Sequence, residues 1–338
     1  MATPTNNGLP ANGLVGIILR GEAYRNHDAS SFMASQSLAH DDSRSSCVPT
    51  IDATRLQMCA TTALLDKVVR PLVRDLGNTI HLSLVECSRR LGCPLVERTL
   101  LPLLQHEPGV HLVGNRTRCR SRTQSENLRF AVTAFMDGSL GHGVKLRDYQ
   151  LVLILRHDMS VRDGPITHWT GDFGRFNFMI RRCRWQKHTD DKNGPTFMID
   201  SAHALPGRYL RRWVEGAIGH DGCFGQGVDP TRGHPHGHYC REVTSAALGG
   251  DDRVGTLQVF PCEQLTEAAV KANMNSVFRS DPWPYKWLCV PSFAIDWHAE
   301  ATAAALRTLR GAGYDGLEAA VSRAQQSRAG ADSLALES

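Results

Sequence analysis

The chain has 338 residues, 41% of them apolar, so it can bury a sizeable core in one large domain or two modest ones. Charged residues make up 21% and the formal net charge is +4, which excludes the dense basic surface of a general nucleic-acid-binding protein. The first thirteen residues are polar and no run approaches the roughly 18 apolar residues of a membrane span, so the sequence predicts neither a secretory signal nor a membrane-spanning segment.

Apolar runs alternate with helical patterns along the first half of the chain. Residues 14–19 form a short continuous apolar run, typical of a central parallel strand that is covered on both faces. Residues 52–74 have the spacing of a helix that Pro71 should kink or end. Strands are expected at 80–85, 110–113 and 149–155, and helices at 95–104 and at 123–136, the last ending at Asp137-Gly138. This alternation predicts a parallel sheet with helical crossovers.

The second half is less regular. We expect a strand at 196–199, a helix at 206–218, a long Gly- and His-rich loop at 219–250, and short strands at 256–260 and 287–290. The predicted organisation is a disordered start (1–13), a nucleotide-binding α/β half (14–160), a second half of the same domain that holds the acceptor and catalytic groups (161–297), and a helical tail (298–338). The fold class is therefore α/β: an open, mostly parallel, Rossmann-like sheet flanked by helices, with an irregular C-terminal extension.

Ligands of open α/β sheets bind outside the carboxyl ends of the strands, so the residues that follow each strand are the candidate site. The first strand leads into Arg20, Gly21 and then Arg25, and the strand at 149–155 leads into Arg156-His157-Asp158. A carboxylate at the tip of a buried strand can hold a divalent cation against a diphosphate, and Asp158 has this position. The alternative is that Asp158 caps the following turn or pairs with Arg156.

An apolar strand that runs into Arg-Gly, three βα units and a strand that ends in Asp158 together resemble glycosyltransferases of the GT-A type. Among these, the chain is similar to poorly characterised algal and protist proteins of nucleotide-diphospho-sugar transferase type, over about residues 14–240. The resemblance implies a nucleotide-sugar donor beside Arg20, Gly21 and Arg25, and Mn²⁺ or Mg²⁺ held by Asp158 as the final acid of an Asp-x-Asp signature. The acceptor is unknown and can be a glycan, a protein or a small molecule.

One departure from that signature concerns the metal. Arg156 stands where the first acid is expected, so the alternative is that its guanidinium binds the diphosphate directly and no cation is needed. An inverting transfer also needs a base for the acceptor hydroxyl. Asp200, after the strand at 196–199, is the first candidate, with Asp172 and His203 behind it. Asp200 has an alternative role as the cap of the following helix.

The densest group of metal-binding residue types lies in the predicted loop at 219–250. Two segments, His220-Asp221-Gly222-Cys223 and His234-Pro235-His236-Gly237-His238-Tyr239-Cys240, contain enough Cys and His for a zinc site but lack the Cys-x-x-Cys spacing of strong assignments. In a second interpretation, His220 or His238 reaches the diphosphate or its cation. In a third, this is a solvated loop.

The ten cysteines lack the spacing of a disulfide framework, which predicts reduced thiols and favours a cytoplasmic location. Asn115-Arg116-Thr117 fits the glycosylation sequon, which matters only if the chain enters the secretory route. No phosphate-binding loop and no Gly-x-Gly-x-x-Gly follow the first strand, which disfavours ATPases and dinucleotide dehydrogenases. A glycosyltransferase is thus the leading hypothesis, and the alternatives are a non-catalytic transferase-like binding module and a metal-dependent hydrolase.

Overall fold

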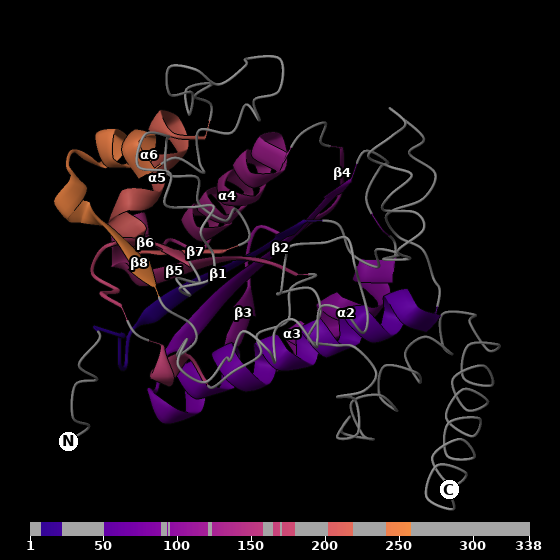
Figure 1. Ribbon diagram of the computed structural model, residues 1–338. Helices are drawn as coiled ribbons and strands as arrows, with labels where there is room; N and C mark the ends of the chain where they lie inside the picture. The colour runs from indigo at the N-terminus through magenta and orange to yellow at the C-terminus, as the bar shows by residue number, and fades with distance from the viewer. Residues whose placement is uncertain are drawn as a thin grey trace, which may run out of the picture.

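The structure is a computed structural model, and it describes residues 8–21, 51–88, 93, 95–120, 124–157, 165–169, 171–179, 202–218 and 241–257. Within these residues the chain forms one mixed sheet with helices on both faces (Figure 1). Of the expected elements, the strands at 196–199 and 287–290 and the C-terminal helical tail lie outside the described residues.

Eight strands form the sheet, in the order β3-β2-β1-β5-β7-β6-β8, with β4 pairing to β2. The strands are β1 (Leu14–Gly21), β2 (Thr79–Ser88), β3 (Val110–Leu112), β4 (Arg116–Arg120), β5 (Tyr149–Arg156), β6 (Phe176–Met179), β7 (Ala202–Leu205) and β8 (Val254–Leu257). Only β7 is antiparallel to its neighbours β5 and β6 in this sheet; the other pairings are parallel. The expectation of an open, mostly parallel α/β sheet is confirmed for the part of the chain that the structure describes.

Helices cover both faces of the sheet (Figure 1). One face carries α2 (Ile51–Leu64), two π-helical turns at Leu65–Val69 and Pro71–Asp75, a third at Val96–Leu100, and α3 (Leu101–Gln105). The other carries α4 (Gln124–Gly141) and α5 (Gly207–Gly216), and α6 (Arg241–Leu248) packs on α5. Side chains of β1 alternate between two apolar clusters, with Ile17 and Leu19 on the α2 face and Ile18 on the α4 face. A strand covered on both faces needs this continuous apolar sequence.

A new helical turn begins at Pro71, the position where the sequence predicts a kink or an end of the helix after β1. Pro71 begins a π-helical turn that runs to Asp75. Proline has no N–H to donate, and at the first position of a helical turn that donor is not needed, so Pro71 is tolerated where it begins this turn.

Helix α4 also runs longer than expected, because Gly138 does not end it. A Cβ on Gly138 would lie 2.3 Å from the backbone nitrogen of Gly114, so this glycine lets the helix approach the turn after β3. The glycine serves packing here and does not cap the helix.

Four short elements differ from the sequence expectations. The basic segment at 116–120 is strand β4, and β6 lies in a stretch that the sequence left unassigned. Strand β7 lies where the sequence predicts only the approach to a helix, and α6 occupies the end of the predicted loop at 219–250. The predicted disordered start does not extend to residue 13, because Leu9 is buried and Asn78 Nδ2 donates to Pro10 O at 2.8 Å.

Cys93 and Cys119 are each disulfide-bonded. The expectation of reduced thiols is therefore wrong for these two positions. Among the described helices, none combines the length and apolar character needed to cross a bilayer.

Candidate functional site

The sheet order reverses between β1 and β5. From β1 the chain proceeds outward through β2 and β3 on one side, and β5 then pairs with the other side of β1. In an open α/β sheet a crevice forms at such a reversal, at the carboxyl ends of the strands, and ligands bind there. We call the edge where β1, β2 and β5 end the carboxyl edge, and the opposite edge the amino edge.

Two arginines meet at the carboxyl edge. Arg20 of β1 and Arg156 of β5 are register partners in parallel strands, so their side chains leave the sheet on the same face, the one covered by α4. Arg20 is only 2% exposed, whereas Arg156 is partly exposed. The backbone continues this pairing, because the His157 N–H donates to Arg20 O at 3.1 Å. Arg156 is thus the cation nearer to solvent, and Arg20 lies behind it.

A carboxylate and a histidine meet on the opposite face of the same strand ends. Glu86 of β2 is the register partner of Gly21, and both Glu86 and His157 are buried. His157 Nε2 lies 2.9 Å from Glu86 Oε2, although the ring is not aligned for a hydrogen bond. Gly21 ends the strand that lies between the two strands carrying this pair. Its φ of 126° lies where residues with a Cβ are strained.

Helix α2 also contacts the carboxyl end of β5, through the side chain of Gln57. Gln57 is buried, and its Nε2 donates to His157 O at 2.7 Å. The contact joins residues 100 positions apart in the sequence. The end of β5 is therefore held by the backbone of β1, the side chain of Glu86 and the side chain of Gln57. We refer to Arg20, Gly21, Glu86, Arg156 and His157 as the switch-point site.

The two described candidates for the acceptor base do not lie at the switch-point site. His203 of β7 is fully buried at the level of Ile154, among the rings of Phe176, Phe178 and Trp213. Asp172 precedes β6, a strand parallel to β5 in direction, so it lies at the amino edge. Its carboxylate is exposed there and pairs with Arg175, Oδ2 to Nε, at 2.9 Å.

Five further candidates, Arg25, Asp158, Asp200, His220 and His238, lie outside the described residues. Within the described part, no group of three or more His, Cys, Asp and Glu side chains is arranged to hold a metal ion. The described donors of the switch-point site are mainly basic, and its one carboxylate, Glu86, already faces His157. This donor set does not suit a divalent cation, so no step is assigned to one.

Sequence reasoning missed Glu86 and Gln57. Glu86 directly follows the expected strand at 80–85, so the rule that points to Arg20 and Arg156 also points to Glu86. Gln57 has no such signal, because a polar residue within a helical pattern reads as part of the solvated face.

The chain matches no protein-family model, and no curated protein is significantly similar to it in sequence.

Proposed function

We propose that this protein is a glycosyltransferase that uses a nucleotide-diphosphate sugar as donor, with the diphosphate bound at the switch-point site. The observation that carries the proposal is the register pairing of Arg20 with Arg156 at the carboxyl ends of β1 and β5. Arginine binds phosphate oxygens in bidentate fashion, so the partly exposed Arg156 can contact a diphosphate directly, and the buried Arg20 adds positive charge behind it.

The same two cations suit the chemistry of sugar transfer. When the glycosidic bond to the donor breaks, negative charge builds on the departing diphosphate oxygen. Fixed cations stabilise that charge best when they need not move during the reaction, and Arg20 is buried and bonded through its carbonyl to the end of β5. In this proposal Arg156 contacts the diphosphate from the solvent side. Asp200 stays the candidate base for the acceptor hydroxyl.

The GT-A assignment is part of the same proposal. It is supported by the open α/β sheet, by the order reversal between β1 and β5, and by the Arg-Gly pair that ends the central strand. The antiparallel strand β7 separates β5 from β6, which differs from the 3-2-1-4-5-6 order of dinucleotide-binding sheets. This difference agrees with the lack of a dinucleotide fingerprint in the sequence.

Calorimetric titration of the full chain with UDP, GDP and their sugars, with and without Mn²⁺, tests the proposal. We expect one diphosphate to bind, and Arg156→Ala to weaken its binding about tenfold or more through loss of a charged contact. Arg147→Ala is the matched control, because Arg147 is 72% exposed and belongs to the turn before β5, at the amino edge. If no nucleotide binds, or if both variants bind equally well, the proposal is wrong.

A non-catalytic binding module is the second candidate, and the residues before Asp158 favour it. The first acid of the expected signature is Arg156, and His157 is held against Glu86 and Gln57. Donor hydrolysis or transfer to any acceptor, abolished in Asp158→Asn, would show an enzyme. Tight diphosphate binding without turnover would show the binding module.

A further inference from the structure

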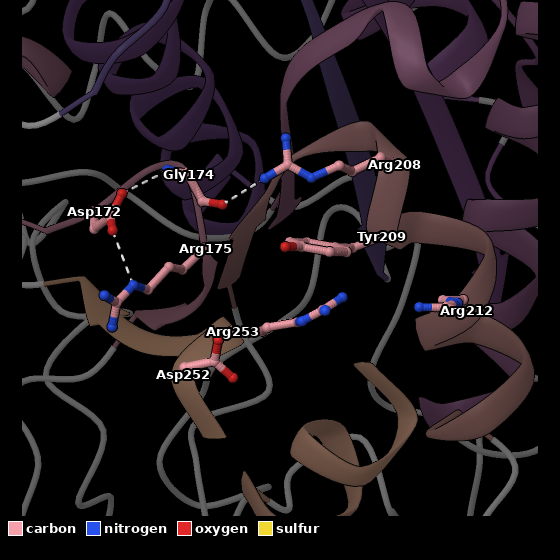
Figure 2. A pocket seen from close by; sticks show the side chains of 8 residues that line it. All are labelled: Asp172, Gly174, Arg175, Arg208, Tyr209, Arg212, Asp252 and Arg253. Atoms are coloured by element: carbon pink, nitrogen blue, oxygen red, sulfur yellow. Dashed lines mark hydrogen bonds and ion pairs between the residues drawn. The ribbon is translucent and has the colours of Figure 1, made fainter. Parts of the chain in front are cut away.

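An arginine-rich pocket opens at the amino edge, far from the switch-point site in the sheet. It is a wide hollow open to solvent, has a volume of about 630 Å³, and is lined by four arginines, two aspartates, a tyrosine and a glycine (Figure 2). The arginines are Arg175, Arg208, Arg212 and Arg253. We call this the arginine pocket. Its lining therefore has an excess of positive charge.

The fold brings these arginines together from three elements. Arg175 and Arg253 directly precede Phe176 and Val254, which are register partners in β6 and β8, so they are neighbours at the amino edge. Strand β7 runs the other way and ends at this edge, where α5 begins at Gly207. Arg208 and Arg212 lie one turn apart on α5 and project from the same side of the helix.

Part of the pocket is fixed before any ligand binds. Asp172 accepts from the Gly174 N–H at 2.9 Å and pairs with Arg175, and Arg208 Nη2 donates to Gly174 O at 3.1 Å. Asn177 is buried and stabilises the turn from Asp172 to Arg175, because its Nδ2 donates to Asp172 O and Arg175 O. Such preorganisation lowers the entropy cost of binding.

The guanidinium groups of Arg212 and Arg253 make no hydrogen bond or ion pair with any residue that the structure describes. Arg208 lies over the Tyr209 ring, 4.8 Å from its centre, and Figure 2 shows that ring between Arg208 and Arg253 in this view. Guanidinium groups therefore lie next to the ring of Tyr209 in the lining of the pocket.

We propose that the arginine pocket binds a small molecule or glycan unit that carries a phosphate or sulfate group. Guanidinium forks match tetrahedral oxyanions in charge and geometry. The volume exceeds that of a bare ion and falls in the range of ligand pockets, so there is room for a sugar ring beside Tyr209. This site is separate from the proposed donor site and does not depend on it.

Calorimetry on the full chain with glucose 6-phosphate, glucose 6-sulfate and uncharged glucose tests the proposal. We expect one or both anionic sugars to bind, glucose not to bind, and the affinity to fall with added salt. The two anionic probes distinguish phosphate from sulfate as the source of the oxyanion. Arg212→Gln with Arg253→Gln should weaken binding about tenfold or more.

Arg211→Gln is the matched control, because Arg211 is the neighbour of Arg212 on α5, is 59% exposed and pairs with Glu215 away from the pocket. It should bind as the unmodified chain does. Equal affinity in all variants, or binding lost equally with Arg211→Gln, would overturn the proposal. If the double variant weakens UDP binding instead, the nucleotide occupies the amino edge, and the proposed donor site is wrong as well.

A separate observation concerns Asn115, which lies in the turn between β3 and β4. Its side chain bridges a gap between these two short strands, since Oδ1 accepts from the Leu84 N–H at 2.9 Å. Asn115 is exposed and begins the sequon Asn115-Arg116-Thr117. A glycan joined through Nδ2 leaves Oδ1 free to keep accepting from Leu84, so this backbone contact is compatible with modification.

We infer that Asn115 is an N-glycosylation site and that the chain matures in an oxidising compartment. The disulfide bonding of Cys93 and Cys119 is the independent support, because disulfides persist in the compartments where N-glycans are added. This replaces the cytoplasmic location that the cysteine spacing favours.

The test is to produce the full chain in a eukaryotic secretory host and to measure its intact mass before and after enzymatic removal of N-glycans. We expect a glycan on the unmodified chain and on Thr117→Ser, and none on Asn115→Asp or Thr117→Val. Asn115→Asp is the informative variant, because its carboxylate keeps an acceptor for Leu84 N. A folded, secreted chain with no glycan at Asn115, or with free thiols at Cys93 and Cys119, would overturn the inference.

Discussion

At the scale of single residues, the contact between Glu86 and His157 decides the geometry of the switch-point site. Both side chains are almost fully buried, and removal of one partner leaves the other without this polar contact at 2.9 Å. We expect Glu86→Gln and His157→Gln each to lower the free energy of unfolding by about 1–3 kcal/mol. The double variant should lose less than the two single losses added together.

Urea denaturation of the four proteins of this cycle measures the coupling. The control cycle uses Arg147 and Asp148, whose side chains are 72% and 51% exposed and 4.0 Å apart, and should show almost no coupling. Additive losses for Glu86 and His157 would contradict a direct interaction between them.

His81 has a lowered pKa, chiefly because burial disfavours its charged form, with smaller contributions from His111 and His142. The His111 and His142 rings lie 5.9 and 6.1 Å from its own. Tyr149 OH donates to Ser139 Oγ, so His81 Nδ1 donates to Tyr149 OH, at 2.8 Å in each case. The folded protein therefore favours neutral His81.

Stability should consequently depend on pH near this histidine. Below about pH 6.5 the unfolded chain binds a proton at His81 that the folded chain resists, so the free energy of unfolding should fall as the pH decreases. His81→Gln keeps a donor for Tyr149 but does not titrate, and should flatten this slope between about pH 5 and 7. Urea denaturation at several pH values measures it. The exposed His106→Gln serves as control, and an unchanged slope in His81→Gln would contradict the prediction.

At the scale of secondary-structure elements, α4 reaches the sheet through glycine contacts. A Cβ on Gly114 would lie 1.9 Å from Ala134 O, and the residue has a φ of 61°. We expect Gly114→Ala to lower the free energy of unfolding by about 2 kcal/mol or more, since it adds backbone strain and a clash with the helix backbone.

Gly143→Ala separates these two causes. Gly143 has a φ of 74° but no atom within 4 Å of its would-be Cβ, so this variant should show the backbone strain alone, about 1 kcal/mol. Thermal denaturation of both variants measures the difference. Equal losses would contradict a close approach between α4 and the turn after β3.

The sequence predicts those elements whose apolar pattern is long and continuous. Strands β1 and β5 are covered on both faces, and their runs of Val, Ile and Leu show this directly, whereas β2 is recognised by its alternation of apolar residues with His81 and Ser83. Strand β4 reads Arg-Thr-Arg-Cys-Arg, so its alternation resembles a solvated basic segment and conceals an edge strand. Strand β7 contains two alanines and a histidine in four residues, a composition with little strand preference, and only its neighbours β5 and β6 impose the conformation.

The candidate site was predictable to the same degree. The strand-end rule finds Arg20 and Arg156, because both directly end strands that the sequence predicts. It cannot tell that Asp172 and His203 belong elsewhere, because that depends on the antiparallel direction of β7 and on the pairing of β6 with it. Gln57 reaches the site through a contact across 100 positions, which no local pattern shows.

At the scale of the whole molecule, strand β4 and its cysteine lie beside the end of β2 that carries a residue of the candidate site. Strand β4 has only three register pairs with β2, so backbone pairing alone holds it weakly. Cys119 lies on this strand in a disulfide, and its Sγ is 3.4 Å from Glu86 O. The disulfide-bonded Cys119 thus lies against the segment of β2 that carries Glu86.

Reduction should therefore weaken both the fold and the site. We expect dithiothreitol to lower the free energy of unfolding by about 2–4 kcal/mol, and the melting temperature by about 4 °C or more. Cys119→Ser should start from a lower melting temperature and respond less to dithiothreitol, because one of the reducible bonds is already missing. Hydrogen exchange provides the local readout: amides of β4 and of the end of β2 should exchange faster after reduction, whereas those of β5 and β7 should change little. A melting temperature unaffected by reduction, in a chain whose cysteines are shown by alkylation to be reduced, would contradict a stabilising role for the disulfide.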